Sequence, residues 1–500
     1  MTNPENKLLE GHFREQERYS FENFVKRFSS EISQERARIL IRKLKEHGVL
    51  KQVKNKEEKD LSELVEEDVS MESVENCDEE KYFVFTFVGI LWVGSCLIKC
   101  YPKYFTEKLE NKDACKQELT TVFKVLRKYN RGADKEIVHL YNGSEEKSFN
   151  FLAVMLYLLN DYYENGLYPN EKELMETNGT GDILWDRTIN DTFAILQNGR
   201  PYYMELKTRR RALDEMDYFR RLHQCILSEC SKELEDKGIL ELFDLTSTEE
   251  SDEGLDDFGD DDYICYRIEN ELNVQFNTRK RLLLKTMYAY VKKNASMQTE
   301  DNFSLFGTNA FHVVWEKVCK EVLQDRFMAR KKNLPAEIQA QMGEADNLAS
   351  YIERPKWNLN NQSDTKNRDT LIPDLITISE SEKLFAIFDA KYYKVKVEDE
   401  KISGQPGIES VSKQFMYEHA YKKIVPEDWI KYNAFLFPVL DESELFERKG
   451  KVWMDMFCGE PLNLQPIQII FVNPKKAYQK YLQNENGVSD MLTVINSQNT

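Results

Sequence analysis

The stretch LIPDLITISESEKLFAIFDAKYYKVK, residues 371–396, decides the fold. Two apolar, strand-like runs flank a polar turn at residues 379–383. Short apolar runs joined by polar turn residues are typical of an antiparallel β-hairpin. Pairing about this turn predicts that Asp374 lies near Asp389 and Lys391.

These three charged residues suit one kind of chemistry. Residues two apart in a strand share a face, so Asp389 and Lys391 should project together. Two carboxylates supply the oxygen ligands that Mg²⁺ prefers, and this ion leaves positions for water and phosphate oxygens. A metal-bound water is a better nucleophile, and the cation offsets charge on phosphorus. We expect Asp374 and Asp389 to bind Mg²⁺, and Lys391 to orient or deprotonate the water or to stabilise the pentavalent phosphate.

The spacing resembles the PD-(D/E)-x-K nuclease motif. Here the motif reads Pro373-Asp374, fourteen intervening residues, and Asp389-Ala390-Lys391. The resemblance implies cleavage of a phosphodiester bond. The alternative is that charged residues merely flank a hairpin in an acidic protein.

Helices are expected on both sides of the hairpin. FGTNAFHVVWEKVCKEVL, residues 306–323, has helical periodicity, with Glu316 one residue from its apolar stripe. The nuclease superfamily often adds a helical acid to the metal ligands, which makes Glu316 a candidate, although it could equally be an ordinary surface glutamate. Downstream, KQFMYEHAYKK resembles the Q-x-x-x-Y motif of RecB-type nucleases at Gln414, but Glu418 stands where the tyrosine is expected.

A second acid, acid-x-lysine pattern lies upstream. Asp191 is followed by Glu205-Leu206-Lys207, with Asn198-Gly199 as a hairpin turn between them. No proline precedes Asp191, so this pattern ranks below the Asp374 site. It predicts a degenerate second nuclease-like lobe or a β-ribbon facing DNA, with phosphate contacts from Lys207, Arg209, Arg210 and Arg211.

The N-terminal residues predict a DNA-reading module. A short helix from Phe21 to Phe28 precedes a second helix that begins at the N-cap Ser33 and stops at Gly48. Two short helices followed by a strand suggest a winged helix. Away from its apolar stripe the second helix carries basic residues, as a recognition helix does, although an ordinary solvated face is the alternative: Arg36, Arg38, Arg42, Lys43 and Lys45.

The sequence as a whole predicts an α+β protein of five parts. Residues 1–53 form the winged-helix-like module, and the acidic residues 54–80 a tether. YFVFTFVGILWVGSCLIKCYPKYF at 82–105 predicts a β-meander that opens a β-rich and helical region, 81–246, for DNA or partner binding. Nine acids between Glu249 and Asp262 predict an exposed linker, 247–263. Residues 264–500 are expected to form the nuclease core, a mixed sheet flanked by helices.

The overall composition excludes several classes of protein. The 500 residues carry a net charge of −18, which opposes a histone-like role but allows a locally basic cleft. Nine cysteines without a C-x-x-C pair and six dispersed histidines form no zinc motif. No apolar run suits a membrane span or signal peptide, so we expect a cytoplasmic protein. No phosphate loop is present, so nucleotide hydrolysis by this chain is not expected.

Together these features resemble LlaJI-type restriction endonucleases, a group related to the McrC nuclease subunit of McrBC systems. The resemblance runs from residue 82 to about 482 and rests on the 82–105 stretch, GDILWDRTINDTFAILQNGRPYY, FGTNAFHVVWEKVC and the Asp374-to-Lys391 signature. It implies a Mg²⁺-dependent type II-like endonuclease that cuts double-stranded DNA, in a system whose methyltransferase protects host sites. It also suggests a McrB-like AAA+ GTPase as a partner.

Two other functions stay open. One is a nuclease of repair or of mobile elements. The other is a catalytically inactive nuclease fold that docks to an AAA+ GTPase. A double-strand cut needs two scissions, so the nuclease function predicts a homodimer or two binding events.

Overall fold

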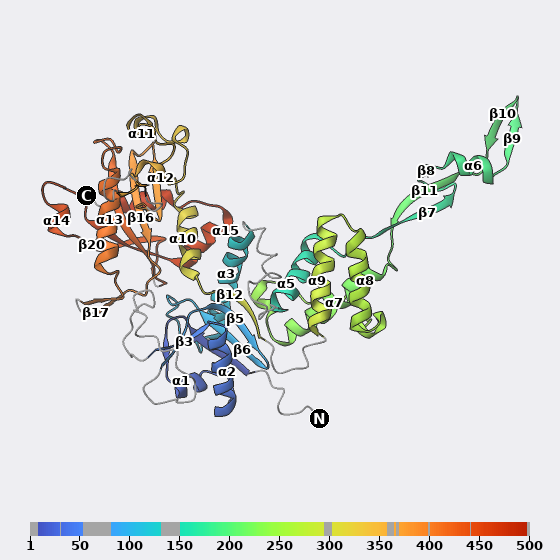
Figure 1. Ribbon diagram of the computed structural model, residues 1–500, viewed down its shortest axis with the longest axis horizontal. Helices are drawn as coiled ribbons and strands as arrows, with labels where there is room; N and C mark the ends of the chain where they lie inside the picture. The colour runs from blue at the N-terminus through green and yellow to red at the C-terminus, as the bar shows by residue number, and fades with distance from the viewer. Residues whose placement is uncertain are drawn as a thin grey trace. The chain divides into compact units, whose positions relative to one another are not determined.

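The computed structural model (Figure 1) describes residues 9–30, 32–53, 82–131, 151–294, 303–357, 365–366, 370–398, 401–440 and 442–497. The predicted tether at 54–80 lies outside the described residues. The chain forms two compact units, and the expected α+β class is confirmed. Unit 1 joins Met1–His139 to Gly307–Thr500, and unit 2 is the insertion Leu140–Phe306. Within the described residues, no helix is both long enough and apolar enough to cross a membrane.

The N-terminal part of unit 1 contains two helices and a three-stranded antiparallel sheet of order β2-β4-β3. The Ser33 hydroxyl accepts a hydrogen bond from Arg36 N, and Gly48, with φ +69°, ends the helix, as predicted. The expected helices and strand are thus confirmed, whereas a winged-helix assignment stays a prediction. The elements are β1 (Leu9–Arg14), β2 (Arg18–Tyr19), α1 (Phe21–Lys26), α2 (Gln34–Glu46), β3 (Leu50–Val53) and β4 (Tyr82–Phe85).

A second sheet, of order β1-β6-β5-β12, corrects two expectations. The predicted meander is split, because β4 pairs in the first sheet while β5 (Val88–Val93) and β6 (Cys96–Tyr101) form a hairpin in the second. The sequence also predicts a first ordered element near Tyr19, but β1 precedes it and pairs in parallel with β6. The last strand is β12 (Phe303–Thr308), and α3 (Lys112–Arg131) follows β6 in sequence.

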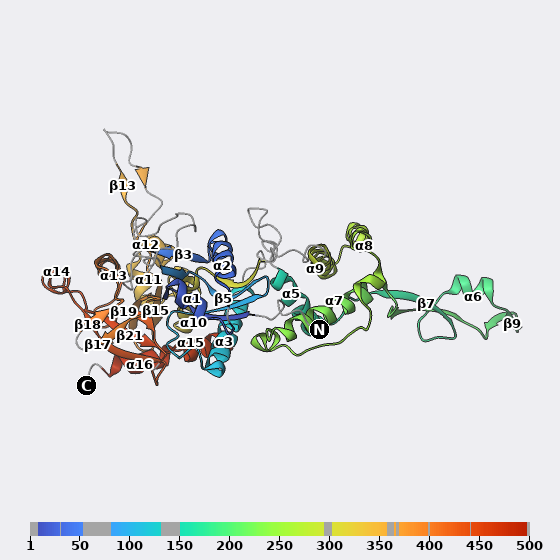
Figure 2. The ribbon, with the colours of Figure 1, turned by 90° about the horizontal axis from the view of Figure 1, so that it is seen from below.

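Unit 2 consists of packed helices and a projecting ribbon (Figure 2). Residues 171–213, called the arm below, carry the three-stranded sheet β7-β11-β8, one helix and the hairpin β9–β10. The packed helices are α5 (Phe151–Asn165), α7 (Tyr218–Asp236), η3 (Leu240–Phe243), η4 (Leu255–Phe258), α8 (Asp261–Val274) and α9 (Thr278–Asn294). The arm contains β7 (Glu171–Thr177), β8 (Asp182–Ile183), α6 (Trp185–Asp191), β9 (Ala194–Gln197), β10 (Arg200–Tyr203) and β11 (Lys207–Leu213).

The acidic segment 247–263 lies within unit 2, and all nine of its acids are exposed or half-buried. Its exposure therefore agrees with the prediction, while its role as a linker stays a prediction. Arg221 on α7 forms an ion pair with Glu253, and the Tyr162 hydroxyl donates to Glu250. Phe258 is buried, with its ring centre 5.6 Å from that of Tyr218. Partners from α5 and α7 thus offset the repulsion expected of the acidic run. The following helices α8 and α9 also pack in unit 2, although residues 264–306 were assigned to the nuclease core.

The C-terminal part of unit 1 is a mixed five-stranded sheet of order β15-β16-β19-β21-β20. The three central strands are parallel, and both edge strands run antiparallel to their neighbours. The expected mixed sheet with helices is present, while its assignment to the PD-(D/E)-x-K superfamily stays a prediction. The strands are β15 (Leu375–Ser379), β16 (Leu384–Ala390), β19 (Ile430–Pro438), β20 (Phe446–Val452) and β21 (Ile467–Val472).

Helices cover this sheet and join it to the N-terminal part of unit 1. Tyr417 and Tyr421 of α13 (Ile408–Tyr421) pack with Phe385 and Ile387 of β16. On α10 (Phe311–Val322) and α15 (Pro474–Gln483), Trp315 and Tyr478 have ring centres 6.2 Å apart, and α3 contacts both helices. The remaining elements of unit 1 are η5 (Lys331–Asn333), α11 (Ala336–Gln341), α12 (Leu348–Tyr351), β13 (Lys356–Trp357), β14 (Thr365–Lys366), β17 (Lys396–Glu398), β18 (Lys401–Ser403), α14 (Asp455–Cys458) and α16 (Val488–Asn496).

Candidate functional site

The hairpin β15–β16 brings the predicted charged residues together. Its first register pair is Leu375 with Phe388, which sets Asp374 opposite Asp389. Asp374 Oδ2 accepts a hydrogen bond from Ala390 N at 2.8 Å. Lys391 Nζ lies 3.0 Å from Asp389 Oδ2. The predicted convergence of two carboxylates and one ammonium is therefore confirmed.

The interior of the sheet fixes the two residues at the end of β16. Asp389 pairs with Phe435 on the parallel strand β19, and is only 6% exposed. Lys391 N donates to Leu436 O at 2.9 Å, which holds the backbone of the lysine to the same strand. The Lys391 ammonium lies 6.0 Å from the centre of the Phe435 ring.

Charge repulsion and burial dominate the electrostatics of the site. Burial and, after it, the nearby carboxylate of Asp389 together raise the pKa of Asp374 to about 7. Burial alone would lower the pKa of Lys391, but the charge and hydrogen bond of Asp389 outweigh it, so the pKa of the ammonium is raised. Near pH 7 Lys391 is therefore protonated, which favours charge stabilisation over the role of a base.

The donor set of this site fits a hard divalent cation. Two facing carboxylates have one ammonium beside them, and the charge of Asp389 adds to burial in raising the pKa of Asp374. In the described part of the chain, no three Asp, Glu, His or Cys side chains are grouped closely enough to hold a metal ion. The protein's own ligands would thus be two carboxylates, and Mg²⁺ commonly completes such a set with waters and phosphate oxygens.

Glu316 is not grouped with the two aspartates. Its carboxylate forms an ion pair with Lys320, one turn along α10. On the same helix burial raises the pKa of the Cys319 thiol, and the charges of Asp374 and Glu316 raise it further. The face of α10 that packs on the sheet therefore presents Cys319 toward Asp374, and Glu316 as a metal ligand is not supported.

Gln414 lies in a buried polar network. It is fully buried, and Nε2 donates to Asn433 Oδ1 at 2.7 Å and to Ile387 O at 3.4 Å. Glu418 accepts from Asn433 Nδ2 at 2.9 Å, so it belongs to the same network. Within the described residues, Gln414 Oε1 has no hydrogen-bond partner.

Tyr417, on the same helix as Gln414, lies near enough to the charged site for both carboxylates to affect its pKa. Burial raises the pKa of its hydroxyl to about 12, and the charges of Asp389 and Asp374 contribute to that rise. Tyr417 lies three residues after Gln414, on the face of α13 that packs against β16. Helical spacing from Gln414 was the only available signal for it, and that signal did not separate Tyr417 from Tyr421.

The basic residues of α2 are not all available to DNA. Arg36 donates a hydrogen bond to the Ser95 hydroxyl in the turn between β5 and β6. Arg38 and Arg42 are exposed, and the Arg38 guanidinium lies 5.9 Å from the centre of the Phe21 ring. Lys43 is half-buried. DNA contact by α2 stays a prediction, and its best candidates are Arg38 and Arg42.

The second acid, acid-x-lysine pattern does not form a site. Asp191, Glu205 and Lys207 are all described, and they make no hydrogen bond or ion pair with one another. Lys207 Nζ donates to Thr177 Oγ1 at 2.9 Å. The two arginines are paired with acids of β7, at 3.6 Å for Arg209 with Glu173 and 2.9 Å for Arg210 with Glu176.

The turn at the tip of the arm follows the prediction. Asn198 and Gly199 have φ values of 51° and 72° and join β9 to β10 in a two-residue hairpin. Positive φ at both central residues is what the Asn-Gly sequence favours.

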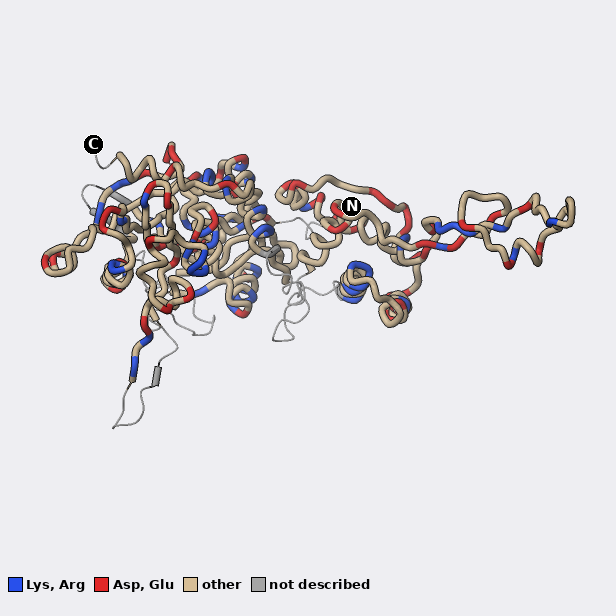
Figure 3. The backbone as a smooth tube through the Cα atoms, turned by 90° about the horizontal axis from the view of Figure 1, so that it is seen from above, with Lys and Arg blue, Asp and Glu red and all other residues tan. Residues whose placement is uncertain are grey.

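Sequence reasoning missed a basic run next to the hairpin. Arg330, Lys331 and Lys332 line a polar pocket of about 600 Å³ together with Gln339, Asp346 and Asn347. The segment before this run is bonded to the edge strand β15, since Arg326 N donates to Ile376 O at 2.7 Å. Both units carry basic and acidic residues (Figure 3). The sequence signal for this basic run was three successive cations in a chain of net charge −18.

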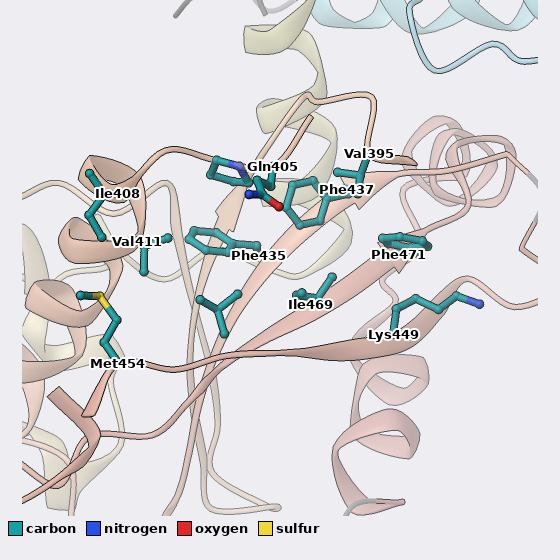
Figure 4. A pocket seen from close by; sticks show the side chains of 12 residues that line it. Val395, Gln405, Ile408, Val411, Phe435, Phe437, Lys449, Met454, Ile469 and Phe471 are labelled. Carbon is teal, nitrogen blue, oxygen red and sulfur yellow. The ribbon is translucent and has the colours of Figure 1, made fainter. Parts of the chain in front are cut away.

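An apolar cavity of about 400 Å³ adjoins the charged site. Phe435, which pairs with Asp389, forms part of its wall (Figure 4). Its lining comes from β19, β20, β21 and the first turn of α13 and includes Ile408, Val411, Phe437, Val452, Ile469 and Phe471. The face of the sheet that carries the catalytic candidates is therefore hollowed next to them.

Comparisons with known proteins relate the chain to restriction enzymes. Residues 87–475 match the family model described as LlaJI restriction endonuclease. The chain is 28% identical over 421 residues to the type II restriction enzyme BsuMI component YdjA of Bacillus subtilis (strain 168). The aligned residues cover 83% of this chain and 84% of that protein.

Two solved structures of Thermococcus gammatolerans are similar at low identity. A half-complex of McrB AAA+ hexamers with bound McrC matches at 11% identity and TM-score 0.37, covering 95% of this chain and 99% of the other. The McrBC complex matches at 13% identity and TM-score 0.26, covering 64% and 88%. Because the family model spans well over half of the sequence, this chain belongs to the LlaJI restriction endonuclease family.

Proposed function

We propose that this protein hydrolyses phosphodiester bonds of double-stranded DNA in a Mg²⁺-dependent reaction, as a nuclease subunit of a restriction–modification system. The convergence of Asp374, Asp389 and Lys391 at the end of one hairpin carries the proposal. Family membership supports restriction as its biological setting.

Each of the three charged residues would have its own role in the reaction. Asp374 and Asp389 would hold the ion, which when bound supplies charge to the phosphate and lowers the pKa of a water. Asp374 has to lose its proton before it can act as a ligand, so its pKa of about 7 makes ion binding stronger as pH rises toward neutrality. Lys391, kept protonated by Asp389, stabilises the negative charge that develops on the phosphate oxygens.

Cleavage of plasmid DNA by the full-length protein tests this function. The reactions contain Mg²⁺ or EDTA, each with and without GTP and a co-expressed McrB-like GTPase. Discrete fragments that appear only with Mg²⁺ are the expected result. A smear would favour a nuclease of repair or mobile elements, and plasmid left intact in every reaction would reject the nuclease function in favour of a scaffold.

We also propose that the arm binds a protein partner. The end of the arm exposes large apolar side chains, with Phe193 97%, Leu196 74% and Met204 71% exposed. Exposed apolar clusters of this kind mark protein interfaces, whereas DNA phosphates require free cations. In the arm Lys172, Arg209 and Arg210 are paired with acids, whereas the exposed Arg211 forms no ion pair with a described residue. The partner we propose is a McrB-like AAA+ GTPase.

Replacing Phe193 and Leu196 together with serine is expected to abolish capture of the McrB-like GTPase by the tagged full-length chain. The double variant removes the two most exposed of the large apolar side chains of the arm, which would leave water on binding. Phe276→Ser is the matched control, because Phe276 is 90% exposed in the same unit but lies outside the arm. Equal capture of the double variant and the wild type would reject the arm as the interface.

A further inference from the structure

A buried polar junction lies directly beyond the lysine of the hairpin. The Tyr392 hydroxyl donates to Glu15 Oε2 at 2.6 Å and accepts a hydrogen bond from Lys103 N at 3.2 Å. Tyr392, Glu15 and Lys103 are 5%, 6% and 4% exposed. Glu15 directly follows β1, and Lys103 follows the end of β6. Tyr392 is thus hydrogen-bonded to the residues that follow β1 and β6. These are adjacent parallel strands of the sheet β1-β6-β5-β12, called the N-terminal sheet below.

Packing fixes the ring of Tyr392 as well as its hydroxyl. The Lys103 ammonium lies 4.6 Å from the ring centre and donates to Gln16 Oε1 at 3.0 Å. The rings of Phe311 and Tyr104 have centres 5.5 Å and 6.1 Å from that of Tyr392. Burial, and then the charge of Glu15, raise the pKa of Tyr392, so its hydroxyl remains a donor at neutral pH.

The backbone on either side of Lys391 shows why this junction matters. β16 ends at Ala390, and Lys391 N makes the last bond to β19. Beyond it the strand does not continue, since Tyr393 N turns back to Lys391 O at 3.0 Å. One side of the lysine is therefore held by the sheet, and the other by Tyr392.

We propose that Tyr392 is a positioning residue that, through Glu15 and Lys103, holds Lys391 where its ammonium meets Asp389 and the phosphate. This inference rests on the proposed nuclease function. The position of the lysine then depends on the N-terminal sheet as well as on the hairpin. The elements expected to read DNA and the site expected to cut it are coupled through three buried side chains.

Tyr392→Phe in the full-length chain tests the proposal, with the kinetics of plasmid cleavage and the thermal unfolding midpoint as readouts. A lysine displaced by a fraction of an ångström should lower kcat about ten- to a hundredfold while KM for DNA stays unchanged. Tyr104→Phe is the matched control: its hydroxyl is also buried and donates to a carboxylate, Glu118 Oε1 at 2.8 Å, but lies in a different network. We expect it to lower the midpoint similarly and to leave kcat within about twofold.

Variants of Glu15 separate positioning from general destabilisation. Glu15→Gln keeps an oxygen that can accept from Tyr392 and should retain wild-type kcat, whereas Glu15→Ala should reproduce the loss seen with Tyr392→Phe. The combined Tyr392→Phe and Glu15→Ala variant should lose no more than either one alone.

Three outcomes would overturn the proposal. The first is wild-type kcat in Tyr392→Phe, and the second is an equal loss in Tyr104→Phe; both leave the nuclease function standing. The third is a wild-type protein that never cuts DNA, which rejects the nuclease function and this inference together.

Discussion

Asp374→Ala is expected to lower the rate of Mg²⁺-dependent plasmid cleavage by about a thousandfold, the scale seen when one strong electrostatic contributor to a transition state is lost. The substitution removes one of the two carboxylates that would bind the ion. It also removes the acceptor for Ala390 N, which ties the two strands together beside Asp389. Initial rates of linear-fragment formation measure the effect.

Lys391→Ala should lose cleavage on the same scale, because no other ammonium pairs with Asp389 among the described residues. Lys413→Ala is the control, since Lys413 is an exposed lysine of the same unit that pairs with Glu409 on α13. All three variants should bind DNA like the wild type in gel-shift assays. Cleavage by Asp374→Ala at the wild-type rate would reject the assignment of the site.

Asp374→Asn is expected to stabilise the metal-free protein near pH 7.5 by a few kcal/mol, from about 1.4 kcal/mol for each unit of pKa change. The pKa of Asp374 is raised from 3.8 to about 7 on folding. The folded wild type therefore binds this proton more tightly than the unfolded chain does. The contribution of this proton to the free energy of unfolding is fully present below pH 3.8, falls as pH rises toward 7, and is lost above that value.

Urea unfolding of both proteins in EDTA, at about pH 5 and about pH 7.5, measures this difference. Asparagine has no proton to lose in that range, so the advantage of the variant should grow with pH. Added Mg²⁺ should restore stability to the wild type at the higher pH and much less to the variant, because binding to the folded state alone raises the free energy of unfolding. A difference between the proteins that is the same at both pH values would contradict the raised pKa of Asp374.

The central hairpin could be predicted because its signals are local. Two apolar runs and a polar turn set the register, and the register alone places Asp374 opposite Asp389. Glu316 and Gln414 could not be placed in this way, since the side of a helix that meets a sheet depends on packing between distant segments. Burial and the charge of Asp374 raise the pKa of Cys319 on α10 and of Tyr417 on α13, two residues that the motif spacing did not single out.

The distinction between local signals and packing of distant segments also explains which other features could be predicted. Asn198-Gly199 predicted its hairpin because the turn depends on two adjacent residues. Phe193 is exposed, although apolar residues usually face a core, so the sequence pattern did not reveal its exposure. The acidic run at 247–263 was expected to repel itself into solvent, and its compensating partner Arg221 comes from a different helix.

The division of unit 1 between the two ends of the chain affects how the protein is made. Tyr104 bonds to Tyr478 at 2.9 Å, across 374 residues of sequence. At about 5–20 residues per second, a ribosome needs roughly 20 to 75 seconds to add that length. Unit 2 can bury its own helices during this delay, because all of them have been synthesised by Phe306. The aromatic surface around Tyr104 cannot be covered so early, and we expect chaperones to bind the nascent chain there until the last helices leave the exit tunnel.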